Sequence, residues 1–338
     1  MRILVATDAW MPQINGVVVT LQNTLRELEL AGHAVEVVGP DRFVSIPCPT
    51  YPEIRLALSP TRGLAKTLAG FLPDAVHIAT EGPIGLAMRK LCVRDKIPFT
   101  TSYHTRFPEY VHARTRLPVA ISYAWLRHFH APAEAVMVAT AAIHEDLARR
   151  GFARLVRWAR GVDTTLFRPG PPTPNDWQRP VFMYVGRVAV EKNIGAFLSL
   201  DLPGTKVVVG DGPQRAALER RYADAVFTGA KVGEELAAHF RSADVFVFPS
   251  RTDTFGLVML EAMASGTPVA AYPVPGPLDV VRQGESGMLD DDLRAAALAA
   301  LELDRETVRR YAVDYSWQRA TAEVLAHLRP DHVRLRPA

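Results

Sequence analysis

Short runs of β-branched residues alternate with longer amphipathic stretches along the whole chain, and this alternation limits the fold more than any other feature. The stretch Val17–Ala31 has the length and spacing of a helix, and Gly32 follows it where helices often end in a left-handed residue. In the first half the expected strands are Ile3–Ala6, Val35–Gly39, Ala75–Ala79, Pro98–Ser102, Ala135–Ala139 and Leu155–Ala159. In the second half they are Val181–Gly186, Lys206–Gly210, Ala225–Thr228, Val245–Pro249 and Pro268–Tyr272. Strands separated by helices are typical of parallel sheets covered by helices, so we predict an α/β fold.

The two sets of strands indicate two domains. At 338 residues the chain is long enough for two α/β domains of ordinary size. Between the sets lies a segment rich in proline and glycine, Arg168–Asp176, which excludes helix and sheet alike. We therefore predict Rossmann-like domains at residues 1–167 and 179–315, a linker at 168–178, and a C-terminal helix and tail at 316–338 that packs back towards the first domain.

Composition places the protein in the cytoplasm. The chain is 48% hydrophobic and 22% charged, which is typical of a globular protein, and it holds no apolar run long enough to span a bilayer. Asp8 interrupts the first apolar run before a signal peptide could be completed. The two cysteines have neither metal-ligand spacing nor a framework of disulfide partners, so we expect reduced thiols.

The strongest functional signal is a pair of carboxylates after the strand that ends at Pro249. Asp253 stands in the loop and Glu261 lies two turns inside the helix that follows, so one carboxylate can bind a sugar and the other a ribose. We expect Thr254 to cap this helix and to leave free N–H groups for an anion. Those N–H groups belong to Phe255, Gly256 and Leu257. The alternative is an ordinary capped helix with a core glutamate.

Two cations follow the first strand of the second domain. Arg187 comes directly after the strand and Lys192 lies near the start of the next helix, so both can converge on a pyrophosphate. A solvated pair at a strand–helix turn is the alternative.

The first half contributes two candidate residues. His104 stands at the carboxyl end of a strand, where open α/β sheets bind ligands, and Gly16 opens the first helix and allows a close approach of ligand to backbone. A purely structural histidine is the alternative. The turn before Gly16 lacks the GxGxxG spacing of dinucleotide-binding domains, which counts against a dehydrogenase. The histidines form no convincing metal set, so we expect no metal.

Taken together, these stretches resemble the retaining glycosyltransferase family 4 of the GT-B fold, and in particular its bacterial glycolipid-forming members. The resemblance covers almost the whole chain. The stretches that carry it are Pro12–Val17, Ser102–Thr105, Arg160–Asp163, Phe167–Pro169, Gly186–Arg187, Glu191–Lys192, Gly210–Pro213 and Asp253–Glu261.

The resemblance implies two Rossmann-like domains facing a central cleft, with a nucleotide-sugar donor on the second. Arg187 and Lys192 would bind the diphosphate, Glu261 the ribose, and Asp253 the donor sugar. The sugar would also meet the amides of Thr254, Phe255, Gly256 and Leu257, and the base would meet backbone near Lys231 and Val232. His104 and Gly16 would reach across from the first domain. In such enzymes the leaving phosphate deprotonates the acceptor, so the resemblance implies no metal and no cofactor.

One residue departs from the family pattern. Family members usually carry glutamate at both ends of the carboxylate motif, whereas this chain has Asp253 at the first. The donor sugar therefore cannot be borrowed from members with glutamate. We favour a UDP-hexose, with GDP-mannose as the alternative. Other readings are a GT-B epimerase or phosphorylase, and a non-catalytic nucleotide-sugar-binding protein.

The positive charge is concentrated between residues 101 and 160, which hold nine arginines against four carboxylates. Interleaved aromatics include Phe107, Tyr110, Trp125 and Phe129, and residues 118–131 have the pattern of an amphipathic helix that settles at a lipid interface. We therefore predict a peripheral membrane enzyme with a lipid acceptor such as diacylglycerol, an anionic membrane surface as partner, and no nucleic acid. The alternative is a solvated helix face with buried aromatics.

Overall fold

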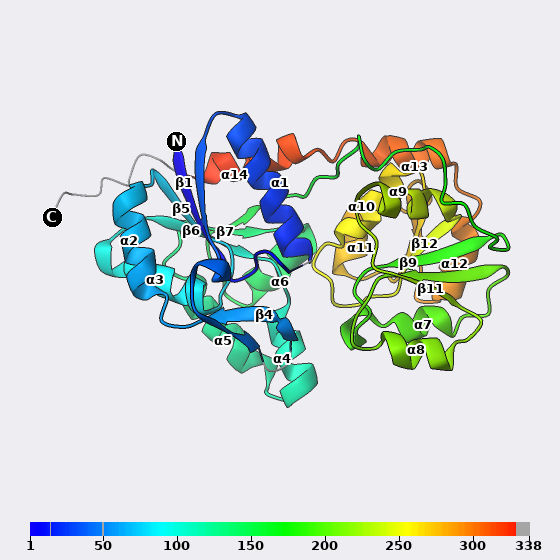
Figure 1. The fold of residues 1–338 in the computed structure, drawn as a ribbon, viewed down its shortest axis with the longest axis horizontal. Coiled ribbons are helices and arrows are strands. Elements are labelled where there is room, and N and C mark those ends of the chain that lie inside the picture. The colour runs from blue at the N-terminus through cyan, green and yellow to red at the C-terminus, as the bar shows by residue number, and fades with distance from the viewer. Residues whose placement is uncertain (14, 49–50, 329–338) are drawn as a thin grey trace. The chain divides into compact units, whose positions relative to one another are not determined.

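A computed structural model describes residues 1–13, 15–48 and 51–328 of the chain. It divides into two compact units, each with its own parallel sheet and core. Unit 1 holds Met1–Arg160 and the C-terminal segment from Trp317, and unit 2 holds Gly161–Ser316. Figure 1 shows the last helix, drawn in red, within unit 1.

Unit 1 is built on a six-stranded parallel sheet. Its strands, in spatial order, are β2 (Ala34–Val38), β1 (Arg2–Ala6), β5 (Ala75–Ile78), β6 (Phe99–Tyr103), β7 (Ala135–Val138) and β8 (Leu155–Arg157). Ile3 pairs with both Val35 and Ala75, which places β1 between β2 and β5. These are the six strands predicted for the first half, with small shifts at their ends. Strands β1 and β7 are nearly continuous apolar runs, as expected where helices cover both faces of a sheet, whereas β6 also buries Thr100, Thr101 and Ser102.

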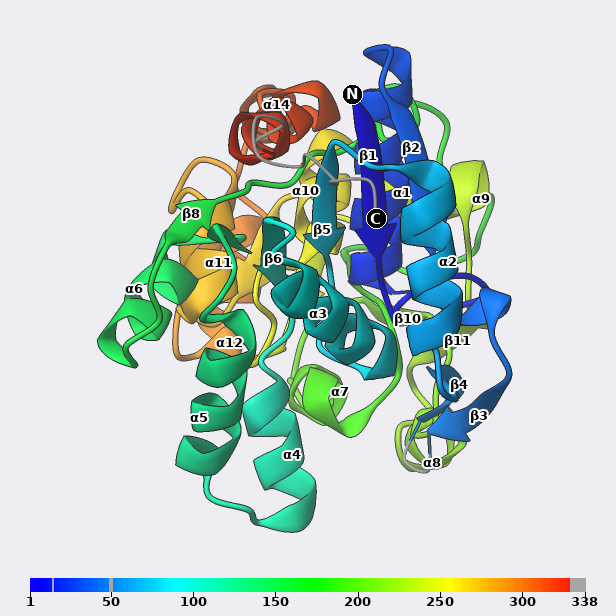
Figure 2. The same ribbon diagram turned by 90° about the vertical axis from the view of Figure 1, so that its left-hand side faces the viewer.

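The helices of unit 1 are α1 (Gly16–Leu30), α2 (Thr61–Phe71), α3 (Pro83–Asp95), α4 (Phe107–Thr115), α5 (Val119–His130), α6 (Ala141–Arg149) and α14 (Trp317–His327). Helices α2, α3 and α5 share one core through Leu64, Met88 and Phe129, and Figure 2 shows α2 and α3 on the same face. Helix α1 lies on the opposite face, and α14 packs against it. The C-terminal helix therefore completes unit 1, as its sequence predicted.

The sequence analysis missed an antiparallel hairpin in unit 1. Strands β3 (Ser45–Cys48) and β4 (Tyr51–Ala57) form this two-stranded sheet after a 3₁₀ turn, η1 (Pro40–Arg42). Pro47 and Pro52 lie within the strands and break the hydrophobic alternation that would reveal them.

Unit 2 contains a second six-stranded parallel sheet. Its strands, in spatial order, are β11 (Val226–Gly229), β10 (Thr205–Val209), β9 (Val181–Val185), β12 (Val245–Phe248), β13 (Val269–Ala271) and β14 (Gly287–Leu289). The five strands predicted for the second half are all present. The short strand β14 was not predicted because its three residues carry no periodic signal.

Helices cover both faces of this sheet. They are η2 (Val190–Lys192), α7 (Ile194–Leu198), α8 (Arg215–Arg221), α9 (Gly233–Ser242), α10 (Leu257–Ala264), α11 (Pro275–Val280), α12 (Leu293–Ala300) and α13 (Arg305–Ala312). Helices α7, α8 and α12 pack on one side through Phe197, Leu218 and Ala297. On the other side Phe240 of α9 meets Phe246 of β12, and α10 packs between α9 and α13. Figure 1 shows α7 and α8 across the strands from α9 and α13.

The predicted linker is bound to unit 2. Within the segment 168–178, the carbonyl of Pro171 accepts a hydrogen bond from Arg241 Nε at 2.7 Å, and the Thr173 amide donates to Ser242 Oγ at 2.9 Å. The division between the compact units falls earlier than this segment, at Arg160 and Gly161. The prolines of the segment 168–178 exclude regular structure, and side chains of α9 form hydrogen bonds with its backbone instead.

No helix in the described ranges is both long and apolar enough to cross a membrane.

In each sheet, the direction in which the chain adds successive strands reverses at the first strand. The chain adds β10 and β11 on one side of β9 and then returns to place β12 on the other side. The loops after β9 and β12 therefore leave the carboxyl edge at the point where the strand order reverses, which is where open α/β sheets bind ligands. We call this position, between the two loops, the crevice of unit 2. In unit 1 the same change occurs between β1 and β5.

Close packing at this edge of unit 2 depends on Gly210. Its φ is +147°, and a Cβ there would lie 1.9 Å from the carbonyl oxygen of Gly186. Side chains rarely adopt such a φ, and backbone cannot yield as a flexible side chain does.

We expect Gly210→Ala to destabilise unit 2 by about 3 kcal/mol or more, measured as the free energy of unfolding in urea. Gly284→Ala is the matched control, because Gly284 has φ +73° but open space around its Cβ position, and it should cost about 1 kcal/mol. Equal losses in the two variants would show that the close approach to Gly186 is unimportant.

Candidate donor-binding site

The crevice of unit 2 is lined by the loops that follow β9 and β12. Arg187 begins the first loop, and the buried Tyr184 hydroxyl donates to its carbonyl oxygen at 2.9 Å. Burial raises the pKa of Tyr184, so this hydroxyl stays protonated and remains a donor. The backbone of Arg187 is thereby held at the end of the strand, where the sequence predicted it.

A lysine and an aspartate join the two loops. Lys192 Nζ, at the end of η2, lies 2.5 Å from Asp253 Oδ1 in the loop after β12. The Asn193 side chain donates to the carbonyl of Pro249 at 3.1 Å, and the Thr252 hydroxyl donates to the carbonyl of Glu191 at 3.3 Å. Residues far apart in sequence are therefore fixed beside each other by one ion pair and two hydrogen bonds.

The second oxygen of Asp253 is buried and has no hydrogen-bond partner among the described residues. A buried carboxylate oxygen without a donor costs free energy, about 1–3 kcal/mol for an uncharged group and more for a charged one. Such an atom is suited to accept hydrogen bonds from a ligand, and sugar hydroxyls are donors of this kind.

The predicted cap at Thr254 is wrong. Helix α10 begins at Leu257, and Gly256 occupies the N-cap position with φ +83° and no side-chain hydrogen bond. A Cβ on Gly256 would lie 2.8 Å from the Met259 side chain and 3.0 Å from the Phe248 ring. Only glycine fits this turn, so the chain enters α10 through a left-handed residue. The amides of Phe255, Gly256 and Leu257 lie in that turn.

Glu261 lies on α10 as predicted, and its environment is unusual for a glutamate. Burial raises the pKa of its carboxyl from 4.5 to about 7. Within the described part of the chain its carboxylate takes part in no hydrogen bond or ion pair. A partly buried carboxylate of this kind is suited to accept hydrogen bonds from a ligand.

Lys231 and Val232 lie at the same edge of the sheet, beyond the end of β11. Val232 is 65% exposed and precedes α9, whose N-terminus has no side-chain cap. Lys231 Nζ is 2.5 Å from Glu235 Oε1. The backbone of both residues therefore lies near the edge of the sheet that carries the candidate site. The charge of Lys231 is paired with Glu235.

The two candidates of unit 1 lie at the carboxyl edge of their own sheet. His104 follows β6, and Gly16 is the first residue of α1, where the Asn15 side chain accepts from the amides of Val17 and Val18. His104 Nδ1 lies 3.2 Å from Nη2 of Arg160, and its ring packs edge-on against Trp158. Arg160 is a residue whose contact with the site the sequence analysis missed.

Only part of the basic segment, residues 101–160, is exposed on unit 1. Asp146 neutralises Arg106 at 2.9 Å and Arg150 at 3.2 Å, and Arg160 is buried. Phe129 is also buried, so it cannot contact a membrane. The side chains of Tyr110 and Arg114 lie outside the described residues. The five net charges predicted for the segment already count Asp146, so these ion pairs leave the net charge unchanged, and the burial of Arg160 lowers the charge that the surface presents.

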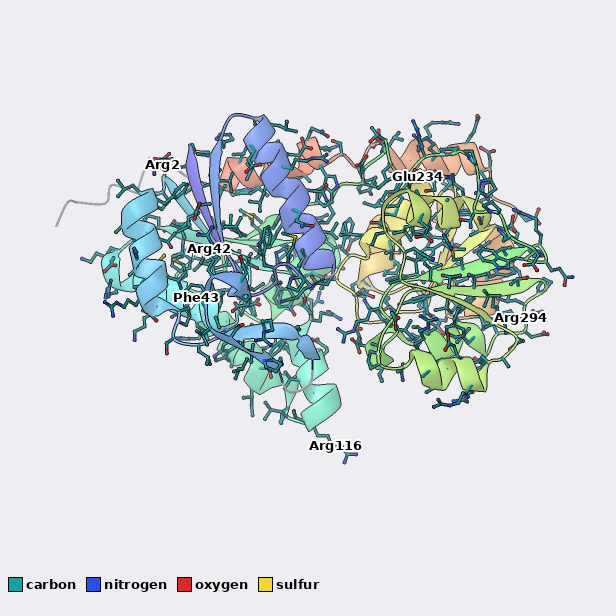
Figure 3. All side chains as sticks on the ribbon, in the orientation of Figure 1. Arg2, Arg42, Phe43, Arg116, Glu234 and Arg294 are labelled. Carbon is teal, nitrogen blue, oxygen red and sulfur yellow. The ribbon has the colours of Figure 1, made fainter. Side chains whose placement is uncertain are left out.

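An exposed apolar surface remains on the α4–α5 hairpin. Ile121 and Trp125 stand one turn apart on α5 and are 55% and 40% exposed, and Phe107 and Leu117 are also exposed. Figure 3 shows Arg116 at the tip of the hairpin, pointing away from the rest of unit 1. We call these five residues the hairpin surface.

Among the described residues, no group of three or more histidine, cysteine or acidic side chains is arranged to hold a metal ion.

Comparison with known proteins identifies the family. The profile described as Glycosyltransferase Family 4 matches residues 14–166, and that of Glycosyl transferases group 1 matches residues 179–304. A GDP-mannose-dependent alpha-mannosyltransferase of Mycobacterium tuberculosis is 32% identical over 96% of both chains. The chain belongs to glycosyltransferase family 4.

Two further similarities bear on this family-4 glycosyltransferase. An alpha-monoglucosyldiacylglycerol synthase of Streptococcus pneumoniae is 28% identical over 89% of this chain and 78% of its own. Sucrose-phosphate synthase from Thermosynechococcus elongatus shares the fold with a TM-score of 0.75, at 20% identity over 96% of this chain and 97% of that one. The fold of the glycosyltransferase is therefore GT-B, as the sequence predicted, and the chain is an enzyme that transfers a sugar.

The raised pKa of Glu261 predicts a stability change with pH. Between pH 4.5 and 7 the folded carboxyl keeps a proton that the unfolded chain has lost, so stability falls as pH rises through this window and then levels off. Glu261→Gln removes this loss of stability. We expect the free energy of unfolding of the variant, relative to that of the wild type, to rise by about 2–3 kcal/mol between pH 4.5 and pH 8, measured in urea without ligand.

Glu302→Gln is the control, because Glu302 is exposed and should show no such gain. A difference between Glu261→Gln and the wild type that stays constant with pH would contradict the buried, unpaired state of Glu261.

Proposed function

We propose that the enzyme transfers a hexose, with retention of configuration and without a metal, from a nucleoside diphosphate sugar to the hydroxyl of a membrane lipid. The observation that carries the donor side of this proposal is the crevice in which Lys192 and Asp253 meet at 2.5 Å. The observation that carries the acceptor side is the hairpin surface of α4 and α5.

Each donor group fits one group of the crevice. The diphosphate gains negative charge as its bond to the sugar breaks, and the cations Arg187 and Lys192 stabilise that charge. The free oxygen of Asp253 accepts from sugar hydroxyls. The carboxylate of Glu261 accepts from the ribose hydroxyls. The acceptor proton passes to the leaving phosphate, so the chemistry needs no protein nucleophile and no metal.

We place GDP-mannose first among the donors to be tested and UDP-glucose second. The order is supported by the mannosyltransferase that matches this chain from end to end, named as GDP-mannose-dependent. UDP-glucose, the donor class favoured from the sequence, remains the second candidate. Asp253 is shorter than the usual glutamate, so it must lie closer to the sugar or meet it through water.

The acceptor is argued from the hairpin surface and from the relatives. Exposed Ile121 and Trp125 are residues that enter the interface of a bilayer, and Arg116 and Arg127 add charge that attracts an anionic leaflet. The diacylglycerol glucosyltransferase among the relatives supports a lipid acceptor. The enzyme would then act from the cytoplasmic side as a peripheral membrane protein.

Replacing either donor cation by alanine should lower kcat/KM about 10- to 150-fold, because each loses one charge-assisted contact that strengthens as the diphosphate leaves. The variants are Arg187→Ala and Lys192→Ala, measured at subsaturating GDP-mannose and again with UDP-glucose. Arg282→Ala is the control, since the exposed Arg282 pairs with Glu285 and lies 4.8 Å from the centre of the Tyr311 ring, and it should keep wild-type turnover. Wild-type rates in both donor-site variants, or a requirement for a divalent ion after treatment with EDTA, would refute this part of the proposal.

Binding to vesicles tests the hairpin surface. We expect Trp125 fluorescence to shift to the blue on anionic vesicles of phosphatidylglycerol and phosphatidylcholine, and co-sedimentation to fall with salt. A double variant, Ile121→Ser with Trp125→Ser, should reduce co-sedimentation about tenfold, whereas Leu30→Ser, at an even more exposed position on α1, should not. Turnover on a soluble acceptor without vesicle binding would overturn the lipid assignment.

A further inference from the structure

Arg160 is a buried arginine at the end of unit 1, next to the predicted site residue His104. Only 4% of its surface is exposed. Its Nη1 donates to the carbonyls of Trp158 at 2.6 Å and Ala159 at 3.1 Å, and its guanidinium lies 4.3 Å from the centre of the Trp158 ring. These contacts leave Nη2 directed at His104, with Nδ1 at 3.2 Å.

The chemistry of the two groups decides the direction of this hydrogen bond. A guanidinium has only N–H donors and no acceptor. His104 Nδ1 must therefore be the acceptor, with a lone pair and no hydrogen. The ring then carries its single hydrogen on Nε2, and the imidazole is neutral.

We propose that Arg160 is a positioning residue that locks His104 in the neutral Nε2–H tautomer, so that His104 serves the transfer reaction as a hydrogen-bond donor to a substrate oxygen and not as a base. The inference rests on the proposed function for the role of His104 in the reaction. The tautomer itself rests on the geometry of unit 1 alone.

The electrostatic surroundings oppose any other state of the ring. Burial lowers the pKa of Arg160 to about 9, so the arginine remains charged at neutral pH. Burial, the charge of Arg160 and the neighbouring His77 all lower the pKa of His104 well below its ordinary value. His77 is itself held between the hydroxyls of Thr100 and Ser102, and its pKa is lowered to about 3. Both histidines therefore stay neutral at physiological pH.

One carboxylate balances the buried charge. Glu323 of α14 accepts the amide of Ala159 at 2.7 Å and raises the pKa of Arg160 against the effect of burial. The C-terminal helix thus supports the position of the arginine.

The lock has a consequence for the reaction. A locked Nε2–H can stabilise an oxygen that holds negative charge or a lone pair, and it cannot take a proton from the acceptor. Nε2 is shielded from bulk water, which strengthens such a hydrogen bond. Proton removal is then left to the leaving phosphate, and His104 adds no titration to the pH profile between pH 5.5 and 8.5.

Nitrogen-15 NMR tests the tautomer directly. The protein is labelled at the histidine nitrogens, and the signals of His104 are assigned by their loss in His104→Gln. We expect Nε2 to carry hydrogen and Nδ1 to be unprotonated from pH 5.5 to 8.5. Hydrogen on Nδ1, or protonation of the ring within this range, would overturn the proposal whether or not the enzyme transfers a hexose.

Kinetics test the role of the arginine. In Arg160→Met the ring can adopt the other tautomer, so we expect kcat at pH 8 to fall about 10- to 100-fold and Nδ1–H to become visible by NMR. Arg160→Lys, which can still donate to Nδ1, should recover most of the loss.

Three controls make the result decisive. Arg157→Met changes an exposed arginine on β8 and should match the wild type. Binding of GDP or UDP, which depends on unit 2, should be unchanged in Arg160→Met, which separates this proposal from failure of the donor site. Circular dichroism and the melting temperature report folding. A folded Arg160→Met with wild-type kcat, or with a lower kcat while His104 keeps its hydrogen on Nε2, would refute the positioning role.

Discussion

The ion pair between Lys192 and Asp253 is the interaction on which the account of the site depends. It joins the loops after β9 and β12 at the point where the chain changes direction in the sheet of unit 2. An ion pair of this kind, partly shielded from water, holds two loops at a defined spacing and also stores a cation that an anionic ligand can use. In the proposed function, a diphosphate that takes over Lys192 would free Asp253 to accept sugar hydroxyls. Donor binding and sugar binding would then be coupled through one lysine.

Sequence reasoning predicted the sheets, and it placed the candidate donor-site residues at the ends of their strands, because those features are local. Strands separated by helices predict a parallel sheet, and a parallel sheet brings the ends of its strands to one edge, so Arg187, Lys192 and Asp253 could be expected together. The cap at Thr254 failed for a tertiary reason: the rings and side chains around Gly256 leave no room for a Cβ, and the helix begins later. The hairpin of β3 and β4 escaped because its prolines remove the alternating pattern.

Contacts between residues far apart in the chain could not be predicted from the sequence. His104 and Arg160 are separated by 56 positions, and only the folded sheet of unit 1 brings them within 3.2 Å. The same holds for the basic segment, where the count of arginines was right but the fold buries Arg160 and pairs Arg106 and Arg150 with Asp146. Charge counted along a chain gives the total, whereas pairing decides what a membrane meets.

The most direct test of this account is the affinity of Asp253→Asn for a free nucleoside diphosphate, measured by isothermal titration calorimetry with GDP and with UDP. The account predicts that the variant binds the preferred nucleotide at least as tightly as the wild type, because the diphosphate no longer has to displace a carboxylate from Lys192, while hexose transfer is largely lost. A variant that binds the nucleotide about tenfold more weakly than the wild type would contradict it, since Asp253 would then support the diphosphate site and not the sugar.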